Sequence, residues 1–95
     1  MNHDEIVKDI NERYPEIEEV ILYPNLAEAY SGLAWGGPYP RALYDFDKII
    51  KIYMKDGMDE MEAIEFFEYN PMRDAQYHGE KGPMFLNMYW FTSDS

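Results

Sequence analysis

Few side chains in the sequence could serve as a nucleophile or as a general base. The chain has two histidines, His3 and His78, and no cysteine, which excludes thiolate catalysis, disulfides and Cys-ligated zinc. Ser31, Ser93 and Ser95 lack the spaced glycines of a nucleophile elbow. Carboxylates are plentiful, but a carboxylate pair needs one member in an apolar pocket, and 95 residues leave little room for a substrate cleft. We therefore expect no catalytic residues and no enzymatic activity.

The spacing of acidic and glycine residues also gives little support for a metal site or a phosphate loop. Asp56, Gly57, Asp59 and Glu62 superficially resemble part of a calcium loop, yet the alternating Asp-x-Asp-x-Asp-Gly order is absent. Asp59 with Glu62 three residues later fits a helix-capping box better. Residues 36–38, Gly-Gly-Pro, lack the Gly and Lys-Ser/Thr that complete a phosphate loop. The sequence predicts no metal and no cofactor.

The acidic residues are concentrated in two segments of the chain. The net charge is −11, with seven acids against two basic residues in residues 1–19 and five acids against none in residues 57–70. This charge argues against direct contact with nucleic acid or an anionic membrane, because phosphate contacts need Lys and Arg clusters. Carboxylates spaced along a helix can instead resemble a phosphate backbone and bind a basic partner. The candidate contacts are Asp59, Glu62, Glu65 and Glu68, and the alternative is a solvated helix face.

A second candidate surface is the ring-rich segment around the Gly/Pro turn at residues 36–40. Trp35, Tyr39 and Arg41 belong to the residue types that dominate interface hot spots, although aromatic residues in a small domain can simply form its core. A nucleotide pocket in which Arg41 and Arg73 converge on the two rings is an alternative. A homodimer through this uncharged region is another, because it keeps the acidic helices apart.

Hydrophobic periodicity and turn residues predict the elements that must position these side chains. A helical stripe of apolar residues covers residues 6–14 and ends before Pro15, whereas residues 16–23 suit either a strand or a further helical turn. Residues 29–44 form a hairpin around the Gly/Pro turn. A helix capped by Asp45 or Asp47 then ends at Asp56 and Gly57.

The second half of the chain adds a further helix and a last strand. Asp59 caps a helix whose buried side is Met61, Ile64 and Phe67, and Pro71 marks its end or a kink. Residues 79–83 form a loop before a strand over residues 84–91. These elements predict an α+β fold, in which a small antiparallel sheet of about three strands packs against two or three helices in one domain over residues 1–95.

Three segments of the chain resemble a family of small, acidic, uncharacterised proteins common in bacteriophage and prophage genomes. They are the Tyr-Asp-Phe-Asp-Lys run at residues 44–48, the acidic helix at residues 57–70 that ends in Tyr-Asn, and the Gly-Glu-Lys-Gly-Pro turn within residues 77–85. The resemblance implies phage origin and a compact fold. It transfers no activity and no catalytic residue to this chain.

The amino-terminal residues and the apolar runs bear on location. Residues 1–5 are acidic where a signal peptide would be basic, and no apolar run reaches about 18 residues, so we expect a cytoplasmic protein. With the acidic surface, the sequence predicts a phage-encoded inhibitor that binds a host or defence protein with a basic, nucleic-acid-handling surface. The alternatives are a nucleotide-sequestering protein and a structural accessory protein.

Overall fold

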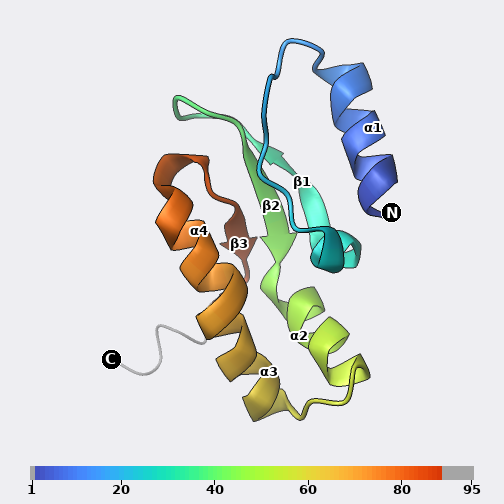
Figure 1. Ribbon diagram of the computed structural model, residues 1–95, viewed down its shortest axis with the longest axis vertical. Helices are drawn as coiled ribbons and strands as arrows, with labels where there is room; N and C mark the ends of the chain where they lie inside the picture. Colours follow the sequence, from blue (N-terminus) through green and yellow to red (C-terminus); the bar gives the residue numbers. More distant parts are fainter. Residues whose placement is uncertain (1, 89–95) are drawn as a thin grey trace.

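The computed structural model describes residues 2–88 of the chain (Figure 1). The helices and short strands confirm the α+β class. In chain order they are α1 (His3–Arg13), the 3₁₀ turn η1 (Pro24–Ala29), β1 (Tyr30–Ala34), β2 (Arg41–Asp45), α2 (Phe46–Lys55), α3 (Glu60–Phe67), the π turn η2 (Glu68–Met72), α4 (Arg73–His78), the 3₁₀ turn η3 (Gly79–Lys81) and β3 (Met84–Leu86).

The sheet has the order β1-β2-β3, and its two strand pairs run in different senses. The hairpin of β1 and β2 is antiparallel, as predicted, with a bulge between Tyr30 and Gly32. β3 pairs in parallel with β2, so the expectation of a wholly antiparallel sheet is wrong. The cause is the connection: α2 leads away from the end of β2, and α3 and α4 return the chain to the end where β2 begins (Figure 1).

The last strand is shorter than its apolar sequence suggested. β3 covers Met84–Leu86, and Asn87 follows with a φ of 65°, a left-handed conformation that does not continue a strand. The predicted strand extended over residues 84–91, and Tyr89, Trp90 and Phe91 lie outside the described residues.

Side-chain caps begin three of the helices. Asp45 accepts a hydrogen bond from the Lys48 amide at 3.2 Å and starts α2. Asp59 and Glu62 form the predicted capping box of α3. Asn2 forms a second capping box at the start of α1, and this box was not predicted from the sequence. A cap satisfies amide groups that have no partner within the helix, so it fixes where each helix begins.

Pro71 interrupts α-helical geometry without ending the helical rod. α3 ends at Phe67, the π turn η2 accommodates Pro71, and α4 continues in line, so the three form one rod on the left of Figure 1. In an α-helix, proline has no amide proton to donate, and its ring clashes with the carbonyl group four residues earlier. The widened π turn relieves this clash. The inner face of the rod includes Ala63 and Phe67, whereas Met61, predicted to be buried, is 67% exposed.

The main hydrophobic core lies between the sheet, α2 and α3. Phe67 is fully buried and contacts the ring of Phe46 at 4.9 Å and that of Phe85 at 4.8 Å, measured between ring centroids. Tyr44 is also fully buried, and its hydroxyl accepts a hydrogen bond from the Tyr23 amide at 2.8 Å. A smaller cluster of Ile6, Ile10 and Ala27 holds α1.

Residues 16–23, which the sequence left ambiguous between helix and strand, belong to neither class. After a turn at Pro15 and Glu16 the chain runs without regular structure as far as Tyr23, in one pass down the molecule (Figure 1). The molecule measures 40 × 28 × 19 Å, with α3 at one end of its long axis and the turn that follows α1 at the other. The two acidic segments of the sequence therefore do not form one continuous surface.

Candidate partner-binding site

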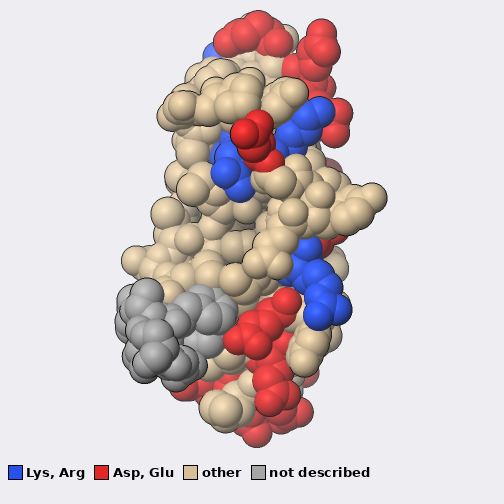
Figure 2. Space-filling view, turned by 90° about the vertical axis from the view of Figure 1, so that its left-hand side faces the viewer, with Lys and Arg blue, Asp and Glu red and all other residues tan. Residues whose placement is uncertain are grey.

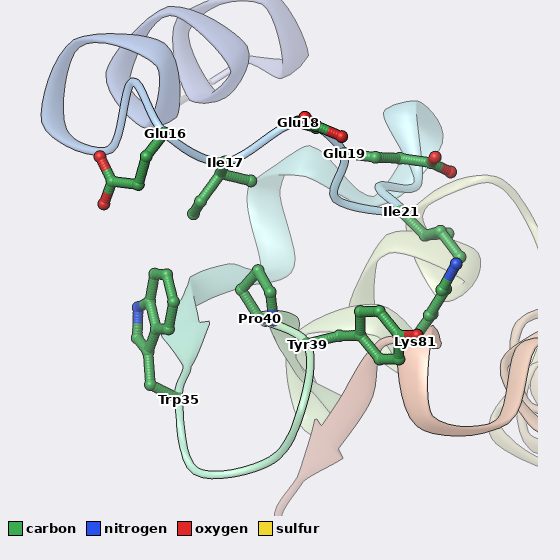
Figure 3. Close-up of a pocket in the computed structure, with 9 residues that line it drawn as sticks. All are labelled: Glu16, Ile17, Glu18, Glu19, Ile21, Trp35, Tyr39, Pro40 and Lys81. Carbon is green, nitrogen blue, oxygen red and sulfur yellow. The ribbon is translucent and has the colours of Figure 1, made fainter.

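A groove of about 600 Å³ lies between the irregular segment that follows α1 and the tip of the β1–β2 hairpin (Figure 3). Apolar and aromatic side chains alternate with charged ones along it. We call it the hairpin groove, and its lining residues are Glu16, Ile17, Glu18, Glu19 and Ile21 from the segment, Trp35, Tyr39 and Pro40 from the hairpin, and Lys81 from η3.

Two aromatic rings of the hairpin groove remain open to solvent. Trp35 is 55% exposed and Tyr39 is 43% exposed, because the Gly/Pro turn between them projects away from the core. Trp35 contacts Tyr14 with ring centroids 5.7 Å apart. The Lys81 ammonium lies 4.7 Å from the centre of the Tyr39 ring, so this ring already holds a cation of the same chain. Trp35 and Glu16 lie together at the other end of the groove (Figure 3).

Three carboxylates beside the groove have no basic partner among the described residues. Glu16, Glu18 and Glu19 are exposed, and the ion pairs in residues 2–88 involve other acids. The groove therefore combines apolar contact area with negative charge, which is the chemistry that attracts a lysine or arginine side chain.

The predicted site residues separate into two groups in the structure. Trp35 and Tyr39 meet in the hairpin groove, but Arg41 lies elsewhere. Its Nε donates to the Gly82 carbonyl oxygen at 2.7 Å, and its Nη2 donates to the Gly79 carbonyl oxygen at 3.2 Å. Arg73 instead lies over the ring of Tyr69 at 5.2 Å. Neither arginine lines the groove, so the predicted nucleotide pocket is not formed around these rings.

The four carboxylates predicted on α3 do not form one row. Because a helix turns about 100° per residue, a spacing of three rotates each successive side chain by about 60° around the axis. In the capping box the Asp59 carboxylate accepts a hydrogen bond from the Glu62 amide at 2.8 Å, and the Glu62 carboxylate accepts one from the Asp59 amide at 3.3 Å. Glu65 is exposed, whereas Glu68 is half-buried at the start of η2. Glu65 is thus the member of the set that has neither a capping role nor burial.

Sequence reasoning missed several groove residues because it did not define the conformation of residues 16–23. Glu18, Glu19 and Lys81 were recognised as charges but not as members of a site. A usable signal was present: Ile17 and Ile21 lie among three acids immediately after Pro15, a mixture of apolar and charged residues typical of an amphipathic edge.

A hydrogen-bonded chain of Tyr23, Asp74 and His78 is the arrangement most similar to a catalytic one. The Tyr23 hydroxyl donates to Asp74 at 2.8 Å, and His78 Nε2 lies 3.4 Å from the same carboxylate. Burial, followed by the contact with Asp74, raises the pKa of Tyr23 far above its ordinary value. The hydroxyl therefore stays protonated and ties residues 16–23 to α4. The Ser31 hydroxyl donates to the Ala29 carbonyl oxygen at 3.5 Å, and within residues 2–88 it makes no hydrogen bond to His78.

Other kinds of site find no support among residues 2–88. In this part of the chain no three His, Asp or Glu side chains are grouped so that they could hold a metal ion. None of its helices has the length and apolar character needed to cross a lipid bilayer. Comparisons with protein-family models, with curated proteins and with solved structures found no significant match.

Proposed function

We propose that the protein acts without catalysis, by binding a positively charged surface of another protein. The observation that carries the proposal is the hairpin groove, which exposed Trp35 lines together with three carboxylates that have no basic partner in the described residues. A tryptophan face and adjacent carboxylates are together suited to a lysine or arginine side chain. Aromatic residues at such a position also supply much of the affinity of protein interfaces.

The distribution of charge supports the same class of partner. Acidic side chains gather toward both ends of the long axis, with uncharged surface and basic side chains between them (Figure 2). A net charge of −11 steers a basic protein toward the molecule and repels nucleic acid. Basic clefts that normally hold phosphate groups have the complementary charge. We therefore propose as partner a host or defence protein that handles nucleic acid, inhibited in the cytoplasm through competition for its basic surface.

The same groove disfavours an anionic small molecule. Glu16, Glu18 and Glu19 line the groove, and Lys81 is the single cation that lines it among the described residues. Arg41 and Arg73, the cations that a nucleotide pocket would need, are bound to carbonyl groups and to a tyrosine ring. A phosphate group placed at the groove would therefore face more carboxylates than cations.

Capture from a bacterial lysate at low and at high salt tests this function. The variants are a groove triple, Glu16→Gln with Glu18→Gln and Glu19→Gln, and a matched α3 triple, Glu60→Gln with Glu65→Gln and Glu68→Gln. The proposal predicts basic, nucleic-acid-associated proteins at low salt, their release at high salt, loss in the groove triple and retention in the α3 triple. Loss of capture in the α3 triple alone would indicate that the partner contacts the carboxylates of that triple and not the groove. Absence of any basic protein at low salt would refute the function.

A further inference from the structure

Over residues 20–22, the segment that borders the hairpin groove has the side-chain pattern of an extended strand. Val20 and Leu22 pack against the main core, whereas Ile21 between them lines the groove. Alternation of this kind, with a period of two residues, is typical of extended chain. Figure 1 shows the segment in a single pass beside the sheet, with no helical turn.

The backbone of residues 18–22 is unpaired within the described part of the chain. Ile17 donates its amide to the Tyr14 carbonyl oxygen at 3.0 Å, and Tyr23 donates its amide to the Tyr44 hydroxyl at 2.8 Å. Between these two anchors, no backbone hydrogen bond joins residues 18–22 to any other residue in the range 2–88. An extended segment fixed at both ends, with free amide and carbonyl groups, can accept an added strand.

We propose that the hairpin groove receives an extended polypeptide segment that carries lysine or arginine. The segment pairs its backbone with residues 18–22 as an added strand and places a cation against Trp35 beside Glu16. This inference rests on the proposed binding function and adds the conformation of the partner. An added strand satisfies the free backbone groups, which a folded basic surface or a helix does not.

The charges of the groove determine which end of it receives the cation. Lys81 already lies over Tyr39, so a second cation at that end would be repelled. Trp35 is more than half exposed and has Glu16 beside it, while Glu18 and Glu19 follow along the segment (Figure 3). Alternate side chains of an added strand face the same side, so one set faces the groove, where a basic residue at the Trp35 end meets Glu16.

The test uses a synthetic peptide of about seven residues that alternates lysine with threonine, with blocked ends. Two comparison peptides carry N-methyl groups on the odd or on the even amides, which removes backbone donors from one edge and keeps every charge. Binding is measured by tryptophan fluorescence in the full chain with Trp90→Phe, so that Trp35 reports alone. Amide hydrogen exchange of residues 18–22 is measured by NMR with and without the unmodified peptide.

The inference predicts salt-sensitive binding that one of the two N-methyl patterns weakens about tenfold or more, together with slower exchange of amides in residues 18–22. In NMR titrations of backbone amides, which need no tryptophan, Trp35→Leu should weaken binding by a factor of about three to thirty, whereas Glu65→Gln on α3 should leave it unchanged. Equal binding of all three peptides without protection of residues 18–22 overturns strand addition and leaves the proposed function standing. Failure of the peptide to bind, while a basic protein is still captured through the groove, also overturns it.

Discussion

The two acidic regions of this chain use the same residue types for different purposes. At α3, Asp59 and Glu62 are bound to backbone amides, so their position is explained by where the helix begins. At the hairpin groove, Glu16, Glu18 and Glu19 have no such role and line a groove that holds two exposed rings. The comparison shows that the density of carboxylates does not identify a binding surface. What distinguishes the groove is the surroundings of its carboxylates, which are apolar, aromatic and without basic partners in the described residues.

The largest expected effect concerns the inner face of α3, which is buried in the main core and therefore stabilises the fold. Phe67→Ala removes a fully buried ring that contacts Phe46 and Phe85, and should lower the free energy of unfolding by about 3–5 kcal/mol. Urea denaturation followed by circular dichroism measures it. Met61→Ala is the control on the outer face of the same helix and should change stability by about 0.5 kcal/mol or less. An equal loss of stability in the two variants would contradict the assignment of Phe67 to the buried face and Met61 to the exposed face of α3.

Substitution of Arg41 tests whether its guanidinium group stabilises the fold or binds a partner. Arg41→Met removes two charge-assisted hydrogen bonds to the carbonyl groups of Gly79 and Gly82, and we expect a loss of about 1.5–3 kcal/mol of stability. Arg41→Lys should recover only part of this loss, because an ammonium does not reproduce the fork of a guanidinium. A variant of unchanged stability that binds a basic partner differently would place Arg41 in the binding site instead.

Substitution of Asp59 tests whether the carboxylates at the start of α3 act as a helix cap and not as a contact surface. Asp59→Ala should cost about 1 kcal/mol of stability, because the Glu62 amide loses its partner. Glu65→Gln, on the same helix and outside the capping box, should change stability by about 0.5 kcal/mol or less. Thermal unfolding of the two variants measures the difference. If Asp59→Ala instead kept full stability and abolished capture of the basic partner, the contrast between the two acidic regions would fail.

The buried tyrosines predict how stability depends on alkaline pH. Burial raises the pKa of Tyr53 to about 12, whereas an unfolded tyrosine ionises near pH 10. Since the folded pKa is the higher one, this stabilisation is complete below about pH 10 and is lost as the pH rises toward 12. Tyr53→Phe should therefore make the decline in stability between these values shallower. An identical slope in the variant and the wild type, from urea titrations across this range, would contradict the prediction.

Local rules were sufficient for much of the fold. The capping box at Asp59 and Glu62 and the hairpin around residues 36–40 were predicted, and Asp45 was one of two candidates, with Asp47, for the cap of α2, because each depends on residues within a few positions. The parallel pairing of β3 was not predicted, because its direction depends on where a crossover of three helices returns the chain. Pro71 was expected to end or kink α3, but the continuation through η2 into α4 depends on packing against the core.

The candidate site was less accessible to sequence reasoning than the fold. Trp35 and Tyr39 were predicted as contacts, and both line the hairpin groove. The role of Arg41 was not foreseen, because its hydrogen-bond partners lie about forty residues away in sequence. Glu18 and Glu19 acquire their position only when the Tyr23 amide binds Tyr44 and fixes the course of the segment. Long-range contacts of this kind leave no periodic signal in the sequence.

The most direct test of the account compares charge removal at the two acidic regions in one binding measurement. A basic protein captured at low salt is titrated against the wild type, the groove triple and the α3 triple, each confirmed as folded by circular dichroism. If the groove binds the partner, the groove triple weakens binding about tenfold or more and reduces its salt dependence, while the α3 triple changes it by less than about threefold. Equal weakening by both triples would mean that overall charge, and not the groove, determines binding, and would contradict the central claim.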